Sequence, residues 1–157
     1  MEQKTKVSAV EGRQEILITR EFELPVNLLF KAYTEAGLIE QWMGNRVLKL
    51  ESWSHGSYRF ETSDPEGNRI SFNGVIHALI PDKKIIRTFE MENTPFGVQL
   101  EVYEFEQLSG GNSQLKMHVI YESAEQRDQL LKLPFRQGIN MAHNRLEQIV
   151  SKLKLTA

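Results

Sequence analysis

The chain has 157 residues, a length typical of one domain, and its 40% hydrophobic and 25% charged residues are ordinary for a globular protein. It has no cysteine, which excludes disulfide scaffolds, thiolate metal sites and cysteine nucleophiles. The formal net charge of −2 excludes a strong overall attraction to nucleic acid or anionic membranes. The first residues carry no apolar signal stretch, and no apolar run approaches the roughly 20 residues of a membrane helix, so we expect a cytoplasmic protein.

The N-terminal residues 1–12 are polar and show no periodicity. We therefore predict a flexible tail there, followed by a single domain over residues 13–157. Within residues 15–24, apolar residues lie two or four positions apart, which predicts a half-buried strand. Arg20 interrupts the alternation.

Two short helices are predicted after this strand. Pro25 suits the start of a helix, because proline there loses no hydrogen bond and its φ is already helical. Gly37 should break this helix, and residues 38–42 form a second short helical turn. Gly44 and the residue after it should end that turn.

Six strand signals follow, separated by turns rich in glycine, proline, asparagine and aspartate. The predicted strands cover residues 47–50, 57–62, 69–80, 85–92, 98–107 and 115–121. Short turns permit only antiparallel pairing, so we expect a meander. Gly74, inside the longest strand, indicates a bulge or a bend.

The final segment, residues 123–155, has the apolar periodicity of an amphipathic helix. Ser123 is a candidate N-cap, with Gln126 in the position that a capping box requires. Pro134 and Gly138 should kink or divide the stretch. Because such a helix needs a sheet to pack on, the predicted fold is α+β: a curved antiparallel sheet wrapped around a long C-terminal helix, with two short helices after the first strand.

Several segments, in this order and spacing, resemble one known family. They are residues 18–22, 25–30, 34–42, 56–60, 64–67, 74–81, 88–89, 127–131, 138 and 144–146. Over residues 15–154 the chain resembles the activator of heat-shock-chaperone ATPase homologue family. This family is a branch of the SRPBCC superfamily, which has the START-like, birch-pollen-allergen-like helix-grip fold. The resemblance implies that fold, and it implies a cavity between sheet and helix.

Apolar and aromatic side chains from many predicted elements should converge between the sheet and the last helix. The candidates for a ligand-binding site are Trp42, Tyr58, Phe60, Phe72, Phe89, Tyr103, Met117, Phe135, Ile139, Met141, Ala142 and Leu146. By their spacing alone, such residues are more typical of a packed core. The resemblance favours the alternative, a largely apolar cavity with a few polar anchors such as Tyr58, Tyr103 or a histidine.

Signals for other chemistry are weak. The four histidines are His55, His77, His118 and His143. They lack metal-ligand spacing, so we expect no metal and no cofactor. His143 is predicted on a solvated flank of the last helix, beside the apolar stripe. No phosphate-binding loop and no nucleophile elbow is present, so we name no catalytic residue.

Three functions stay open, because a fold does not determine a function. The first hypothesis is a module that binds a small hydrophobic or amphipathic molecule, with neither nucleic acid nor membrane as a partner. The second is an enzyme of the cyclase or aromatase kind found elsewhere in the superfamily, which would need a buried glutamate or histidine beside the cavity. The third is an interaction module that stimulates a heat-shock chaperone ATPase through an exposed patch.

Overall fold

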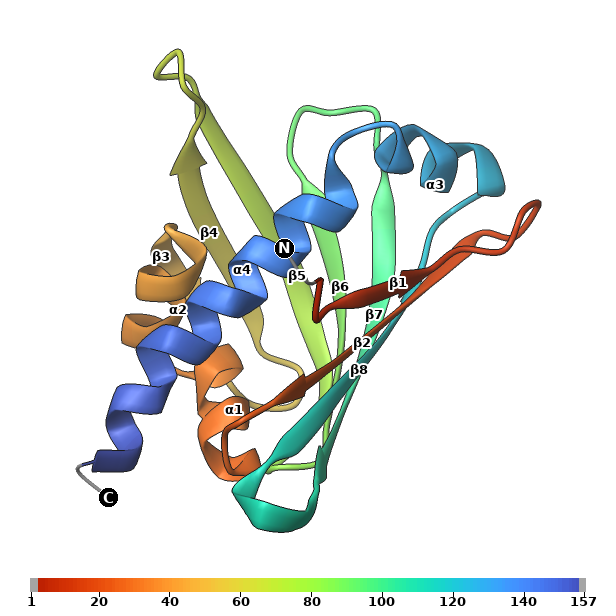
Figure 1. The fold of residues 1–157 in the computed structure, drawn as a ribbon. Coiled ribbons are helices and arrows are strands. Elements are labelled where there is room, and N and C mark those ends of the chain that lie inside the picture. The colour runs from red at the N-terminus through yellow and green to blue at the C-terminus, as the bar shows by residue number, and fades with distance from the viewer. Residues whose placement is uncertain (1–2, 156–157) are drawn as a thin grey trace.

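The computed structural model describes residues 3–155, whose strands form one eight-stranded antiparallel sheet (Figure 1). The strands are β1 (Lys6–Ser8), β2 (Glu15–Phe22), β3 (Arg46–Leu50), β4 (Ser57–Ser63), β5 (Arg69–Ile80), β6 (Lys84–Met91), β7 (Val98–Gln107) and β8 (Ser113–Ile120). The helices are α1 (Val26–Thr34), α2 (Ala36–Met43), α3 (Ala124–Leu131) and α4 (Phe135–Val150), with short 3-10 helices η1 (Ser109–Gly111) and η2 (Ser151–Leu155).

The sheet order is β1-β2-β8-β7-β6-β5-β4-β3, so the meander from β3 to β8 closes on β2. The curved sheet surrounds one side of α4, which crosses it diagonally, and α1 and α2 lie beside α4 (Figure 1). This arrangement confirms the predicted α+β helix-grip fold. All six strands predicted after the helices are present, with ends within two residues of the predicted ends.

The residue that interrupts the alternation in β2 does not interrupt the strand. Arg20 occupies an inward position of the register, and only 2% of its surface is exposed. Its guanidinium donates hydrogen bonds to Thr5 Oγ1, at 3.2 Å, and to Asn144 Oδ1, at 2.9 Å, and it pairs with Glu147. A buried arginine at this position is possible because these partners satisfy its donors.

Residues 1–12 do not form a simple tail, because β1 lies within them. Lys6 pairs with Thr19 at the edge of the sheet, and the side chain of Thr5 is buried. The Thr5 N–H donates to Asn140 Oδ1 of α4 at 3.0 Å. Three residues are too few for a period of two to be visible, which is why the sequence did not reveal this strand.

The C-terminal helical stretch is divided, as predicted, at Pro134. Ser123 caps α3, where its hydroxyl accepts a hydrogen bond from the Gln126 N–H at 3.1 Å. Gly138 lies within α4 and does not break it. Gly37 was predicted to break the first helix, but the break between α1 and α2 lies at Glu35 and Gly37 is inside α2.

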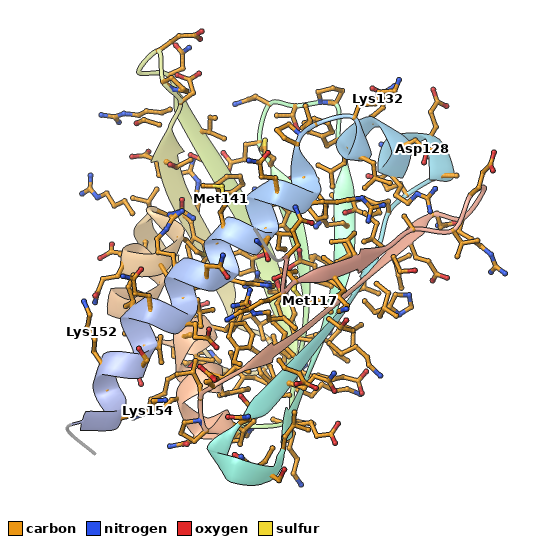
Figure 2. The ribbon with its side chains drawn as sticks, viewed as in Figure 1. Met117, Asp128, Lys132, Met141, Lys152 and Lys154 are labelled. Carbon is orange, nitrogen blue, oxygen red and sulfur yellow. The ribbon has the colours of Figure 1, made fainter. Side chains whose placement is uncertain are left out.

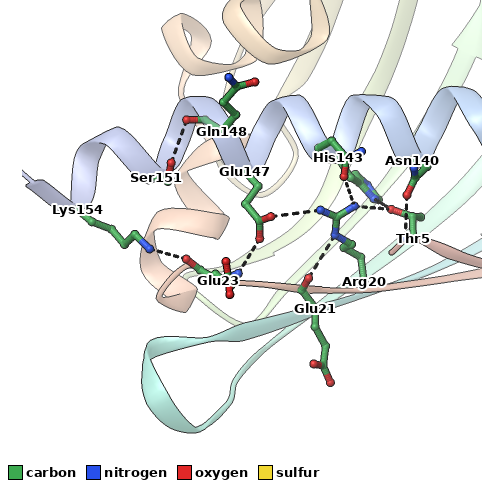
Figure 3. A network of polar contacts seen from close by, with 11 residues as sticks. Thr5, Arg20, Glu21, Glu23, Asn140, His143, Glu147, Gln148, Ser151 and Lys154 are labelled. Atoms are coloured by element: carbon green, nitrogen blue, oxygen red, sulfur yellow. Dashed lines mark hydrogen bonds and ion pairs between the residues drawn. The ribbon is translucent and has the colours of Figure 1, made fainter. Parts of the chain in front are cut away.

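A polar network joins the N-terminal segment and β2 to α4 (Figure 3). His143 was predicted on a solvated flank, but it is 1% exposed and its Nδ1 lies 2.8 Å from Thr5 Oγ1. Burial, with a further contribution from the positive charge of Arg20, lowers the pKa of His143 to about 3. Its imidazole is therefore neutral in the folded protein at neutral pH.

No helix within residues 3–155 has both the length and the apolar character needed to span a membrane.

Candidate functional site

A cavity of about 360 Å³ lies between α4 and the inner face of the sheet. Its walls come from β2, β6, β7 and β8, and from all four α-helices. We call it the α4 cavity, and most of its surface is apolar, as at Ile18, Met117 and Val119. It forms because α4 crosses the curved sheet diagonally and leaves room beneath its N-terminal half.

The structure places seven of the twelve candidate residues in the wall of this cavity. They are Trp42, Phe89, Tyr103, Met117, Phe135, Ile139 and Ala142. Each comes from an inward position of its strand or helix. The candidates thus converge from β6, β7, β8, α2 and α4, as their spacing predicts.

The other five candidates do not line the cavity. Tyr58, Phe60 and Leu146 are buried in the core, and Phe72 stacks on Phe89 with ring centroids 5.3 Å apart. Met141 was a wrong choice, because 54% of its surface is exposed on α4 (Figure 2). It directly precedes Ala142, and this change of position by one residue turns the side chain from the cavity to solvent.

A buried polar cluster of Arg87, Glu101 and Tyr103 forms part of the cavity wall, and we call it the Arg87 cluster. Arg87 Nε donates to Glu101 Oε1 at 2.9 Å, and Arg87 Nη2 donates to the Tyr103 hydroxyl at 2.8 Å. That hydroxyl donates to the same Glu101 oxygen at 2.9 Å. Gln99 Nε2 donates to the other oxygen, Glu101 Oε2, at 2.8 Å.

The charges of the cluster balance each other. Burial alone would lower the pKa of Arg87, but its electrostatic interactions with Tyr103, Tyr58 and Glu101 outweigh burial and raise it. Burial also raises the pKa of Tyr103, against the opposing charge of Arg87. The site therefore holds a permanently charged guanidinium beside a neutral phenol.

Tyr58 packs against Arg87 but does not line the cavity. The Arg87 guanidinium carbon lies 4.8 Å from the centre of the Tyr58 ring and 4.9 Å from that of Tyr103. Both distances suit cation–π interactions. The Tyr58 hydroxyl donates to the carbonyl of Thr88 at 2.6 Å, so it is not available as a ligand anchor.

His143 closes another part of the wall. Its Nε2 lies 3.5 Å from the Tyr33 hydroxyl, while its Nδ1 faces Thr5 Oγ1. A neutral imidazole held between two hydroxyls can accept or donate one hydrogen bond on each side. Within residues 3–155, no three His, Asp or Glu side chains are grouped so that they could hold a metal ion.

Neither Arg87 nor Glu101 was predicted in the site, although the sequence carries a signal for both. Arg87 lies two residues from Ile85 and from Phe89, and Glu101 lies two residues from Tyr103. Both residues therefore lie on the inward face of their strands, because residues two positions apart point to the same face. A charged residue on an inward strand position is a candidate for a buried pair, since an unpaired charge there would be too costly.

Comparison with solved structures shows the fold alone, because the sequence identities are low. A protein from Rhodobacter sphaeroides is 20% identical with a TM-score of 0.84, covering 94% of this chain and 99% of its own. A protein from Nitrosomonas europaea is 21% identical with a TM-score of 0.80, covering 93% and 99%. A protein from Arthrobacter aurescens is 14% identical with a TM-score of 0.83, covering 94% and 91%.

No curated protein matches the chain. The family model described as "Activator of Hsp90 ATPase homolog 1-like protein" matches residues 23–151, which is most of the chain. This match agrees with the resemblance in the sequence and with the helix-grip topology. The chain therefore belongs to the family of Activator of Hsp90 ATPase homolog 1-like proteins.

Proposed function

We propose that this domain binds a small, largely apolar molecule in the α4 cavity. The observation that carries the proposal is the cavity itself: about 360 Å³, with apolar walls and a few buried polar groups. Ligand pockets in proteins typically have volumes of about 300–1,000 Å³ and this kind of lining. A packed core would leave no such space, because protein interiors reach the density of organic crystals.

The cavity suits a ligand of modest size and affinity. A molecule that buries about 200 Å² of apolar surface gains about 5 kcal/mol from the hydrophobic effect. Association costs several kcal/mol in lost freedom, so further contacts are needed for tight binding. Because a micromolar dissociation constant corresponds to about 8 kcal/mol, apolar burial of this size by itself gives binding weaker than micromolar.

The partners of the two acid–base candidates favour binding over catalysis. Glu101 accepts hydrogen bonds from Arg87, Tyr103 and Gln99, which fill most of the roughly four acceptor positions of its carboxylate. His143 is neutral and lies between two hydroxyls. A general base needs a free lone pair directed at the substrate, and the existing hydrogen bonds of both residues compete for that role.

The test compares two tryptophan substitutions on neighbouring positions of α4. Ile139→Trp fills the cavity, while Met141→Trp adds the same ring to the solvent side of the helix. Native mass spectrometry of protein purified from its host, followed by denaturing extraction, shows whether a small molecule is bound. We expect it in the wild type and in Met141→Trp, and we expect its loss in Ile139→Trp.

Equal occupancy in Ile139→Trp and the wild type would refute binding in this cavity. If all three proteins arrive empty, titration with isopropylnaphthalene decides, and a failure of the wild type to bind it would also refute the proposal. The chaperone hypothesis stays a separate prediction. Its measurement is the ATPase rate of the host's own heat-shock chaperone with and without this protein.

A further inference from the structure

Arg87 has a hydrogen-bond donor that the cluster does not use. Its Nε and Nη2 donate to Glu101 and Tyr103, but no residue within 3–155 accepts a hydrogen bond from Nη1. The fully enclosed side-chain atoms without a partner, among these residues, are Ser113 Oγ and Gln126 Oε1. Nη1 is not one of them, so it keeps accessible surface although Arg87 as a whole is only 6% exposed.

That accessible surface belongs to the cavity, because Arg87 is part of the cavity wall. Arg87 is 6% exposed in a mostly apolar wall, so its guanidinium has lost most of its contact with bulk water, and its Nη1 has gained no protein acceptor among residues 3–155. Such a donor costs free energy until it is paired, and its hydrogen bonds are stronger than those of neutral donors. The cavity therefore favours an occupant that carries an acceptor.

The charge balance of the cavity defines which acceptor fits. Arg87 and Glu101 are the charged side chains that line it, and their ion pair spans 2.9 Å. His143, the other side chain of the wall that could carry a positive charge, is neutral at neutral pH. An anionic ligand would gain attraction from Arg87 but would meet Glu101, which lies next to it, at low dielectric. A neutral oxygen acceptor avoids that repulsion.

A second polar group in the wall could compete for the same role. The hydroxyl of Tyr121 has no partner within residues 3–155 and is not fully enclosed, although the residue is buried. A phenol is a weaker donor than a guanidinium because it carries no charge. We therefore assign the main anchoring contact to Arg87 and treat Tyr121 as the alternative to be tested.

We infer that the ligand of the α4 cavity is an uncharged molecule with an apolar body and one oxygen acceptor, such as a ketone, ester or ether, that accepts a hydrogen bond from Arg87 Nη1. This inference rests on the proposed function and makes it more specific. Arg87 is thus the residue that selects among apolar molecules of equal shape, while the apolar walls provide most of the affinity.

Three probes of nearly equal shape test the inference: methyl naphthyl ketone, isopropylnaphthalene and naphthoate. The ketone differs from the isopropyl compound in one acceptor oxygen, and naphthoate adds a negative charge. In equilibrium dialysis we expect the ketone to bind the wild type about ten-fold more tightly than isopropylnaphthalene. We expect naphthoate to bind more weakly than the ketone at neutral pH.

The variant Arg87→Met/Glu101→Met/Tyr103→Phe removes the whole cluster, because removal of one partner would leave a buried charge unpaired. Its matched control is Arg59→Met/Glu92→Met, which removes a partly exposed Arg–Glu pair of similar geometry, 3.0 Å long, outside the cavity. The ketone preference should fall to about one-fold in the first variant and persist in the control. Tyr121→Phe should also keep it.

The outcomes separate the inference from the proposed function. If isopropylnaphthalene and the ketone bind the wild type equally, the cavity binds ligands but Arg87 does not select them, and the inference is wrong. A preference that persists in the cluster variant, or disappears in Tyr121→Phe, also overturns it. If no probe binds, both proposals fail.

Because the cluster variant could fold poorly, NMR of the wild-type guanidinium is a second test. The resonances of the Arg87 Nη1 protons should shift when the ketone is added and should not shift with isopropylnaphthalene.

Discussion

Replacing Gly74 with alanine should destabilise the sheet beneath the Arg87 cluster. The sequence indicated a bulge or a bend at this residue, but the shift of register lies between Ile76 and Ala78. Gly74 instead allows the ring of Tyr58 to lie against the backbone. A Cβ at this position would lie 2.6 Å from the Tyr58 hydroxyl oxygen and even closer to the carbonyl oxygen of Thr88.

The magnitude follows from these two contacts. Real Cβ atoms do not approach other heavy atoms so closely, so both Tyr58 and the β6 backbone would have to move. The 2.6 Å hydrogen bond from Tyr58 to Thr88 would be lost, at about 1 kcal/mol. Overpacking of a filled site adds about 1–3 kcal/mol. We expect Gly74→Ala to lower the free energy of unfolding by about 2–4 kcal/mol in total.

Chemical denaturation monitored by tryptophan fluorescence measures this loss, and thermal unfolding should show a decrease of roughly 5–15 °C. Gly37→Ala is the matched control, because no heavy atom lies within 4 Å of its added Cβ and its helix favours alanine. Tyr58→Phe in the Gly74→Ala background should cost less than Tyr58→Phe alone, since it removes one of the clashing atoms. An unfolding free energy within about 0.5 kcal/mol of the wild type would refute the reasoning.

Three further predictions concern the C-terminal helices. Gly138→Ala should raise the free energy of unfolding by about 0.5–1 kcal/mol, because its Cβ would enter open space within α4; a loss in urea denaturation would contradict this. His143 stays neutral when folded but protonates when unfolded, so its contribution is complete above pH 6.5 and lost as pH falls toward 3. Urea denaturation at several pH values should therefore show a smaller decrease of stability over this range for His143→Gln than for the wild type. Ser123→Ala should cost about 1 kcal/mol through the lost cap of α3, and unchanged thermal unfolding would disprove the cap's contribution.

The sequence predicted the elements well, because their signals are local. Alternation along 69–80 and 98–107 marked β5 and β7 with their observed ends, and Ser123 marked the start of α3. The parity of the strands also placed Tyr103 and Met117 correctly toward the helix. Each of these inferences needs only neighbouring residues, since pleating and helical turns repeat over two to four positions.

Other placements depended on contacts between distant segments. Met141 and Ala142 differ by one position on α4, and the packing angle of the helix decides which of them faces the cavity. His143 is buried because Thr5, which directly precedes an N-terminal strand too short to recognise, lies against it. No local pattern contains that information.

The sequence by itself therefore determined the order of the six strands after the short helices, the inward and outward positions of those strands, and the family. Only the tertiary structure decided that Arg87 and Glu101, 14 positions apart, meet on adjacent strands beside an open volume. The physical reason is that secondary structure follows from periodicity along the chain. A cavity and its buried ion pair instead depend on how far the packed elements stand apart and on which charges they bring together.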